Sequence, residues 1–163
     1  MRKVLFVCHG NVGRSQMAEG FYNAMTQTKD AFSAGTDLLT PLKYSQLPET
    51  ICRIMQEEGI DVSRQKVKLI TEEMVDAAES IVVLCKREQC PDFLLNCHKA
   101  IFWNIEDPYQ MNIDDMRVIR GQIKMNVVAL HLRDLWNTFL ITRYVRLLER
   151  INVKQFLSLR ALA

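Results

Sequence analysis

A cysteine followed by an arginine in a Cys-x5-Arg pattern is the feature of this sequence that most directly suggests chemistry. A cysteine thiolate is a nucleophile, and the planar guanidinium of an arginine matches two oxygens of a tetrahedral oxyanion. Two glycines between them allow the backbone to approach an anion closely. The pattern predicts attack on a bound, phosphate-like oxyanion, within the segment Cys8-His9-Gly10-Asn11-Val12-Gly13-Arg14-Ser15.

The other residues of this segment fit the same chemistry. A loop between a strand and a helix N-terminus directs several backbone N–H groups into one concavity, which favours an anion and also a thiolate. Ser15 can donate its hydroxyl to the Cys8 sulfur, and Asn11 can brace the loop by bonding its own backbone. The simpler interpretation, a buried cysteine beside a turn, is less favoured. The predicted catalytic residues are Cys8, Arg14 and Ser15, and the predicted phosphate-binding residues are His9, Gly10, Asn11, Val12, Gly13 and Arg14.

Secondary structure on both sides must position this loop. Residues 3–8 are a continuous apolar run, typical of a strand buried on both faces of a parallel sheet. The alternation of strands and helices predicts an α/β fold, an open four-stranded parallel sheet with helices on both faces. The further predicted elements are strands over 31–34, 80–85 and 100–105, helices over 15–26, 49–58, 71–79 and 114–135, and a loop over 36–48.

Residues 136–163 differ from the predicted catalytic domain, residues 1–135. From Arg117 onward there are nine Lys or Arg and two Asp or Glu residues. The pattern predicts a basic amphipathic helical extension, with Arg143, Arg146, Arg150 and Lys154 opposite Leu140, Tyr144, Leu147, Leu148 and Ile151. Packing on the sheet or in a dimer is favoured over docking on an acidic membrane surface or partner.

Composition limits the class of protein. The chain has 163 residues, 48% apolar and 25% charged, as expected for one globular catalytic domain. A net charge of +2 gives no ground for a nucleic-acid partner. The N-terminal apolar run is too short for a secretory leader, and no stretch is long enough to span a membrane. The five cysteines are therefore expected to be reduced thiols in the cytoplasm.

The segment over 8–15 resembles the phosphate-binding loop of the low-molecular-weight protein tyrosine phosphatases and of the related thiol-coupled arsenate reductases. The resemblance extends over residues 3–135 and includes Ser33-Ala34-Gly35-Thr36, residues 59–63 and Asp107-Pro108-Tyr109. The phosphatases are most similar in Asp-Pro-Tyr. The reductases are most similar over residues 14–20 and in a cysteine pair after the third strand. The resemblance implies a low-molecular-weight phosphatase-like fold and a covalent Cys8 intermediate. No metal or other cofactor is expected, because the loop itself supplies the positive potential.

Asp107 follows the fourth predicted strand, at the carboxyl edge where sites of open α/β sheets assemble. The resemblance implies that Asp107 protonates the leaving group and then activates water against a Cys8 phosphoenzyme. Tyr109 is expected to form a wall for an aromatic leaving group. Residues 36–43 contain no aromatic side chain, which weakens the case for tyrosine specificity, with Tyr44 as a substitute. The alternative for Asp107 is a simple Asp-Pro turn.

Cys85 and Cys90 follow the third predicted strand, on the same edge as Cys8. Resemblance to the reductases implies a redox relay, in which Cys8 attacks arsenate, Cys85 forms a disulfide with Cys8, and Cys90 resolves it. Thioredoxin or a small thiol would then reduce the Cys85–Cys90 disulfide. Two inert core cysteines are a slightly favoured alternative, and a zinc site with Cys97 and His98 is the least favoured.

Lys68 departs from some of those reductases, in which an acidic residue near this point helps to bind a structural potassium ion. The other ligands match Asn11, Glu19 and Ser33. The expectation is that the Lys68 ammonium replaces the ion.

Two activities follow from these residues. The favoured one is hydrolysis of a phosphomonoester, similar to protein phosphotyrosine, on a phosphorylated protein or a small substrate. The alternative is arsenate reduction through Cys8, Cys85 and Cys90. An idle anion-binding module is disfavoured because Cys8, Arg14 and Asp107 are all present.

Overall fold

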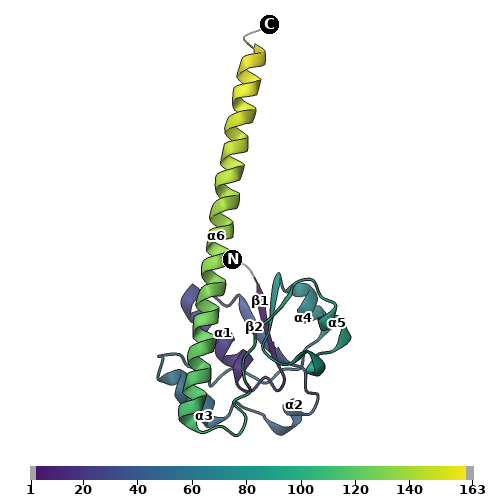
Figure 1. Ribbon diagram of the computed structural model, residues 1–163, viewed down its shortest axis with the longest axis vertical. Coiled ribbons are helices and arrows are strands. Elements are labelled where there is room, and N and C mark those ends of the chain that lie inside the picture. Colours follow the sequence, from purple (N-terminus) through teal and green to yellow (C-terminus); the bar gives the residue numbers. More distant parts are fainter. Residues whose placement is uncertain (1–2, 161–163) are drawn as a thin grey trace. The chain divides into compact units, whose positions relative to one another are not determined.

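The computed structural model describes residues 3–160, and it describes the side chains of residues 3–140 and 142–143. The chain divides into two compact units, one ending at Val127 and one beginning at Val128. The first unit contains a four-stranded parallel sheet in the order β2-β1-β3-β4 (Figure 1). This arrangement confirms the predicted fold class. The strands are β1 (Val4–Cys8), β2 (Ala31–Gly35), β3 (Ser80–Val83) and β4 (Ala100–Phe102).

Strand β1 is buried along its whole length because it pairs with a strand on each side. Cys8, its last residue, pairs with Gly35 of β2, and Val7 pairs with Val83 of β3. The carboxyl ends of three strands therefore meet at one edge. This register brings the segment after Val83 beside Cys8.

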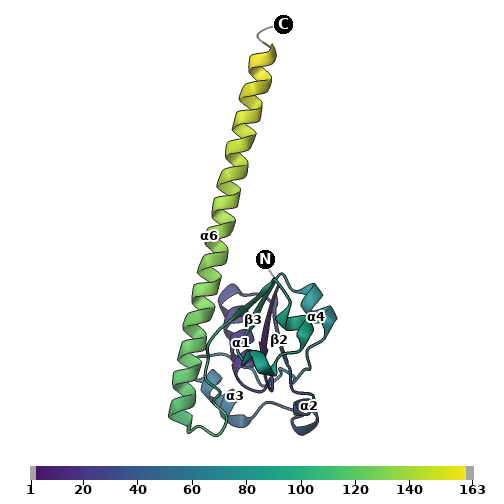
Figure 2. The same cartoon turned by 45° about the vertical axis from the view of Figure 1, so that its right-hand side comes forward.

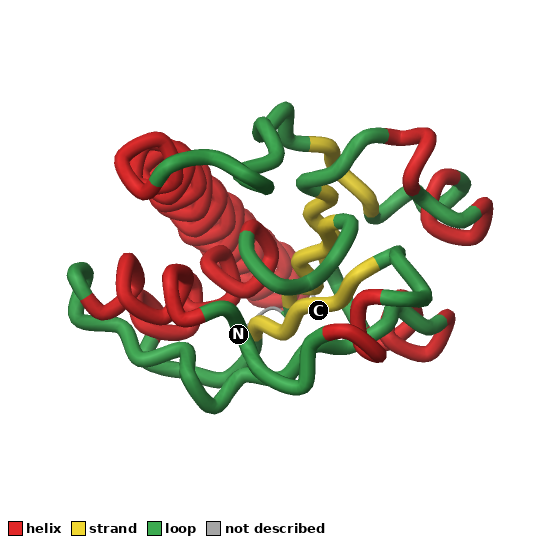
Figure 3. The backbone as a smooth tube through the Cα atoms, turned by 90° about the horizontal axis from the view of Figure 1, so that it is seen from below, coloured by secondary structure: helices red, strands yellow, loops and turns green. Residues whose placement is uncertain are grey.

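Helices cover both faces of this sheet, as the sequence predicts (Figures 2 and 3). On one face, Leu5 and Val7 belong to a buried cluster with Val75 of α4 and Leu94 of α5. On the other face, the Phe6 ring lies 6.0 Å from the Tyr22 ring of α1. The helices are α1 (Arg14–Thr26), α2 (Thr40–Lys43), α3 (Glu49–Gln56), α4 (Glu72–Ala77), α5 (Asp92–Leu95) and α6 (Ile113–Arg160), with a 3₁₀ turn η1 (Arg87–Gln89).

Three segments differ from the predicted elements. Residues 36–48, predicted as a loop, contain α2, in whose first turn Pro41 is compatible with a helix. Strands β3 and β4 end at Val83 and Phe102, earlier than predicted. After β3 the chain forms η1 and α5, two short helical turns. They are too short to show the periodic spacing of apolar residues that predicts a helix.

Helix α6 is continuous from Ile113 to Arg160, where two helices were predicted. No proline or glycine follows Gly121, so no residue type interrupts the helix at the expected boundary. In the second unit, the exposed Trp136 and the Phe139 ring lie 6.1 Å apart. Within residues 3–160, no helix is long and apolar enough to cross a membrane.

The predicted division at residues 135 and 136 stays a prediction, as does the amphipathic character of the extension. Arg143 is described and exposed. The side chains of Arg146, Arg150, Lys154, Tyr144, Leu147, Leu148 and Ile151 lie outside the described side chains.

Candidate active site

The loop after β1 leads directly into the N-terminus of α1. Gly13 precedes the helix and makes no side-chain cap, so the first N–H groups of α1 remain free for a ligand. The left-handed residue of the loop is Asn11, with φ of 53°, a conformation that asparagine tolerates better than most residues. Gly35 of β2 lies beneath the loop, where an added Cβ would come within 2.8 Å of the His9 carbonyl oxygen. Strand β2 thus supports the loop through close backbone contact.

Asn11 braces the loop differently from the prediction, which invoked a bond to its own backbone. Its fully buried side chain donates from Nδ2 to Ser15 Oγ at 2.8 Å and to Ser33 Oγ at 2.9 Å. Its Oδ1 accepts the backbone N–H of Lys68 at 2.8 Å. The amide therefore ties the loop to α1, to β2 and to the segment around Lys68.

The Cys8 sulfur receives polar contacts from within the same loop. Ser15 Oγ lies 3.0 Å from Cys8 Sγ, and the backbone N–H of Asn11 donates to the sulfur at 3.2 Å. Because Asn11 donates to the Ser15 oxygen, the Ser15 hydroxyl proton is left to donate to sulfur. This arrangement stabilises negative charge on a nucleophilic sulfur.

Arg14 connects the loop to two other strand ends. Its Nη1 donates to the carbonyl oxygens of Leu84 at 2.8 Å and Ile105 at 3.2 Å, and Nη2 lies 2.5 Å from Asp107 Oδ2. The Tyr109 backbone N–H donates to the other Asp107 oxygen at 3.2 Å. Asp107 is thus held over the anion loop, with about half of its side chain exposed. A carboxyl group at this place can exchange protons with a leaving group or with water.

A cavity of about 350 Å³ opens over Cys8 and Arg14. Tyr44 and the largely exposed Tyr109 both contribute to its walls. Among the predicted site residues it brings together Cys8, His9, Gly10, Val12, Gly13, Arg14, Asp107 and Tyr109, whereas Asn11, Ser15, Cys85 and Cys90 are not among its lining residues.

Sequence reasoning did not identify several lining residues, because their segments carried no recognised motif. Asp37 is one of them, and hydrogen bonds from Thr40 and Leu39 lower its pKa. The Thr-Pro pair at the start of α2 is typical of a helix N-terminus, and it could have indicated that this segment forms part of the cavity wall. The other missed residues are Thr40, Lys43, Pro48, Thr50, Ile51, Gln110 and Met116.

Cys85 and Cys90 lie next to each other, with their sulfur atoms 3.7 Å apart. Cys85 is buried, and this burial raises its pKa well above the ordinary value. The neighbouring Cys90 and Cys8 raise the pKa of Cys85 further, whereas the Arg14 charge lowers it. Cys8 and Arg14 therefore both act electrostatically on the Cys85 thiol.

Cys90 is less buried than Cys85 and lies closer to solvent. Its thiol donates to the Lys86 carbonyl oxygen at 3.4 Å. Cys97 packs at the edge of the same buried cluster as Cys85. Among residues 3–140, His, Cys, Asp and Glu side chains form no group of three that could hold a metal, so the zinc alternative gains no support.

Comparison with known proteins identifies the family of this fold and site. Residues 3–138 match the family model described as low molecular weight phosphotyrosine protein phosphatase. The chain belongs to this family. It is therefore an enzyme of the low-molecular-weight phosphatase type, a group that includes phosphatases and arsenate reductases.

The relatives of this family member include arsenate reductases at about one-third identity. A "Glutaredoxin arsenate reductase" of Synechocystis sp. is 34% identical over 134 residues, 78% of this chain and 94% of the relative. "Arsenate reductase 1" of Staphylococcus epidermidis is 32% identical over 126 residues, 76% of this chain and 90% of the relative.

Two solved structures of other proteins share the fold. "An arsenate reductase in the phosphate binding state" superposes with a TM-score of 0.69 and 31% identity, covering 82% of this chain and 98% of the other. Vibrio vulnificus Wzb in complex with benzylphosphonate superposes with a TM-score of 0.74 at 20% identity, covering 81% and 98%. At that identity the second likeness shows the fold alone.

In this family member, a lysine ammonium lies in the region where some of the related reductases are expected to bind potassium. Lys68 Nζ lies 3.6 Å from Glu19 Oε2, which is buried and accepts no hydrogen bond from the described residues. Asn11 Oδ1 is already occupied by the Lys68 backbone N–H and by Gln16 Nε2, at 2.8 and 3.0 Å. The Asn11 oxygen therefore has no lone pair left for a potassium ion. We propose that the Lys68 ammonium balances the Glu19 charge.

This proposal predicts that the free energy of unfolding is the same in potassium and sodium chloride at equal ionic strength. Replacement of Lys68 by alanine should lower it by about 1 kcal/mol, because Glu19 loses its cation. Urea unfolding measures both effects, with Lys66→Ala, a change at a neighbouring exposed lysine, as the control. Strong stabilisation of the natural protein by potassium would contradict the proposal.

Proposed function

We propose that the protein is an arsenate reductase that passes oxidation from Cys8 to Cys85 and then to Cys90. The observation that carries the proposal is the contact between Cys85 and Cys90, 3.7 Å between sulfur atoms, in a segment beside Cys8. The names of relatives at 34% and 32% identity support the same activity. These comparisons favour the second of the two activities that the sequence predicts.

The reaction begins when the Cys8 thiolate attacks arsenic and a protonated arsenate oxygen leaves as water. The Cys85 thiolate then attacks Cys8 Sγ, and the electron pair of the sulfur–arsenic bond stays on arsenic. Arsenic is thereby reduced to arsenite, and a Cys8–Cys85 disulfide forms. Attack of Cys90 on Cys85 Sγ next restores the Cys8 thiolate and leaves a Cys85–Cys90 disulfide.

The sheet pairs the residues that precede the first two cysteines of the proposed relay, Cys8 and Cys85. The backbone N–H of Leu84 donates to the Val7 carbonyl oxygen at 2.7 Å, which extends the β1–β3 pairing up to the residues before Cys8 and Cys85. Arg14 bonds the Leu84 carbonyl oxygen, so the anion-binding arginine also holds this strand end. The Cys85 and Cys90 sulfurs must approach from 3.7 Å to about 2 Å to form a disulfide, a small movement of two side chains.

An external dithiol or small thiol closes the cycle by reducing the Cys85–Cys90 disulfide. Cys90 is less buried than Cys85, so we assign the reductant's attack to its sulfur. The Synechocystis relative is named for glutaredoxin. A glutaredoxin- or thioredoxin-like protein is accordingly the partner that we propose.

A map of disulfides after exposure of the fully reduced protein to arsenate tests the relay. The expected product is a Cys85–Cys90 disulfide, or a trapped Cys8–Cys85 disulfide, with release of an equal amount of arsenite. If all five thiols stay free, the reductase proposal fails.

Disulfide formation should also accelerate as pH rises. The raised pKa of Cys85 leaves this thiol mostly protonated near neutrality, and only its thiolate attacks the arsenylated Cys8. At saturating arsenate, the single-turnover rate should increase about tenfold per pH unit between pH 7 and 9. Quenched-flow trapping of free thiols measures this rate, and a flat profile would exclude Cys85 attack as the limiting step.

A second activity, hydrolysis of phosphomonoesters, is supported by Asp107. Its carboxylate contacts Arg14 at the cavity mouth, the place from which a general acid would reach a leaving group. Tyr44 and Tyr109 on the cavity walls suit an aromatic group. We propose that a phosphorylated protein or a small aryl phosphate can therefore be hydrolysed at the same Cys8.

A further inference from the structure

A cluster of ion pairs joins the end of α3 to the first turns of α6, outside the cavity. Arg117 Nε lies 3.2 and 3.0 Å from the two Glu57 carboxylate oxygens, and its Nη2 donates to Oε1 at 2.6 Å. Arg120 Nη1 donates to Glu57 Oε2 at 2.7 Å. Two guanidinium groups thus share one carboxylate. Such a network constrains geometry more than isolated surface pairs do.

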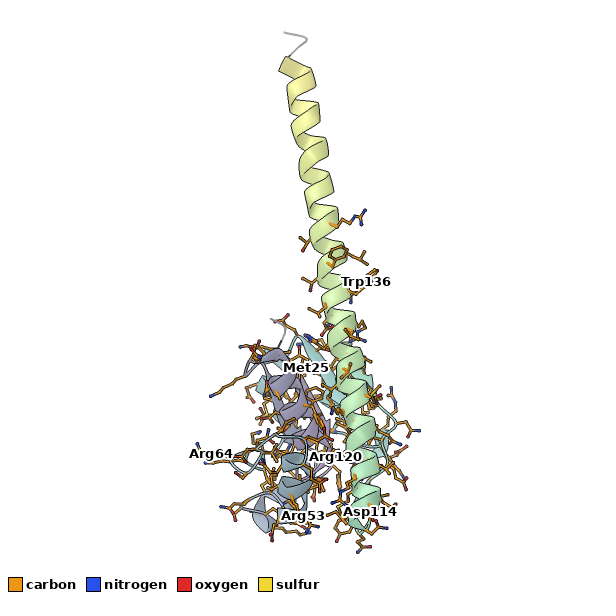
Figure 4. All side chains as sticks on the ribbon, turned by 90° about the vertical axis from the view of Figure 1, so that its left-hand side faces the viewer. Met25, Arg53, Arg64, Asp114, Arg120 and Trp136 are labelled. Atoms are coloured by element: carbon orange, nitrogen blue, oxygen red, sulfur yellow. The ribbon has the colours of Figure 1, made fainter. Side chains whose placement is uncertain are left out.

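Arg120 adds contacts that fix the cluster to the α3 backbone. It donates to the Ile54 carbonyl oxygen at 2.5 Å and pairs with Glu58 at 3.1 Å. Its side chain is only 13% exposed, and Figure 4 shows it between α3 and α6. Lys124 also donates to Glu58, at 2.7 Å. The contacts therefore extend over two turns of α6.

Each of the two joined helices contributes to the cavity wall. On α3, Ile51 lines the cavity, Ile54 follows one turn later, and Glu57 caps the carboxyl end of the helix. On α6, Met116 lines the cavity and directly precedes Arg117. The segment with Asp107 leads into the start of α6. The cluster therefore joins two elements that each contribute to the cavity wall.

We propose that Glu57, Arg117 and Arg120 are positioning residues that set the separation of these two walls. They hold Met116 and the Asp107 segment against the organic group of a phosphomonoester, whereas the loop over 8–14 binds the oxyanion without them. This inference rests on the phosphomonoesterase activity proposed above.

The charges of the cluster persist over the useful pH range. Hydrogen bonds from Arg117 and Arg120 lower the pKa of Glu57 to about 2. The carboxylate therefore stays ionised from pH 5 to pH 9, where kinetics would be measured. Any loss of positioning in a variant must come from the substitution and not from titration of Glu57.

The affinities of two ligands test the inference in the full chain. Under the proposal, inorganic phosphate needs only the anion loop, whereas the benzyl group of benzylphosphonate would also contact the walls. In Glu57→Gln and Arg117→Gln, the affinity for benzylphosphonate should fall about five- to tenfold, and phosphate affinity should stay within about twofold. The double variant should lose less affinity than the two single losses combined, because both substitutions break the Glu57–Arg117 contact.

Kinetic controls separate positioning from general destabilisation. For an aryl phosphate, KM should rise in Glu57→Gln and Arg117→Gln more than kcat falls. In Arg117→Lys, which keeps a positive charge beside Glu57, KM should rise less than in Arg117→Gln. Asp61→Asn, a change at an exposed acid outside the cluster, serves as the matched control.

Unchanged benzylphosphonate affinity in Glu57→Gln, or a parallel loss of phosphate affinity, would overturn the inference. A natural protein that does not bind benzylphosphonate would also overturn it. If the natural protein binds both ligands but does not hydrolyse aryl phosphates, the hydrolase proposal fails, and the ligand affinities still decide the role of the cluster.

Discussion

Replacement of Cys85 by serine should reduce arsenate reduction by a factor on the order of 10³ or more, while hydrolysis of an aryl phosphate stays within about threefold of the natural protein. A serine oxygen cannot form a disulfide with Cys8, so the electron pair of the sulfur–arsenic bond has no route to arsenic. The hydrolase reaction does not need this residue. Cys85 does not line the cavity, and Ser15 and Asn11 continue to contact the Cys8 sulfur.

Arsenite release, coupled to an external thiol reductant, measures the first activity, and p-nitrophenyl phosphate hydrolysis measures the second. Cys97→Ser is the matched control, because Cys97 packs at the edge of the same buried cluster. It should keep both activities, whereas Cys8→Ser should lose both. Sustained arsenate turnover by Cys85→Ser would exclude the relay.

Cys90→Ser separates the last step from the earlier ones. A single turnover should still release arsenite, but the protein should stop as a Cys8–Cys85 disulfide. Both activities should then be lost after one equivalent of arsenate, because Cys8 is no longer free. A Cys90→Ser protein that cycles normally would show that the external thiol attacks the first disulfide directly.

The sheet and its catalytic loop could be predicted because their signals are local. The apolar run over 4–8 marks a strand buried on both faces, and the Cys-x5-Arg segment marks the loop that follows it. Parallel pairing then places the strand ends at one edge, and this predicts that Asp107 and Cys85 lie at the same edge as Cys8.

The supporting contacts could not be predicted, because they join residues distant in sequence and use backbone groups. Arg14 bonds the carbonyl oxygen of Leu84, an atom that every residue type supplies. Asn11 contacts Ser33 and Lys68 instead of its own loop, since the β1–β2 register brings these residues close. The Glu57–Arg117 pair likewise depends on how α6 packs on α3.

Arg14 links the two proposed activities. Its guanidinium contacts the Asp107 carboxylate, which would serve hydrolysis, and the Leu84 carbonyl oxygen, next to the Cys85 that would serve reduction. An oxyanion on the loop would compete with both contacts for the same donors. Under the two proposed activities, binding of arsenate or a phosphate ester would release Asp107 for proton transfer and loosen the strand end next to Cys85.

Replacement of Asp107 by asparagine should lower kcat for an alkyl phosphate by about 10²–10⁴-fold. An alkoxide is a poor leaving group and needs a proton in the transition state, which an amide cannot supply. For p-nitrophenyl phosphate, whose leaving group is a stable anion, the effect on the first step should be much smaller. The loss should therefore increase with the pKa of the leaving alcohol.

The slope of log kcat/KM against the leaving-group pKa, measured over a series of esters, tests this role. A steeper slope in Asp107→Asn than in the natural protein is expected, because the variant must expel the unprotonated alkoxide. Asn also keeps a side-chain oxygen that can accept from Arg14, so the geometry of the arginine is preserved. Equal slopes for the two proteins would remove Asp107 from the chemical step and leave it only the role of holding Arg14.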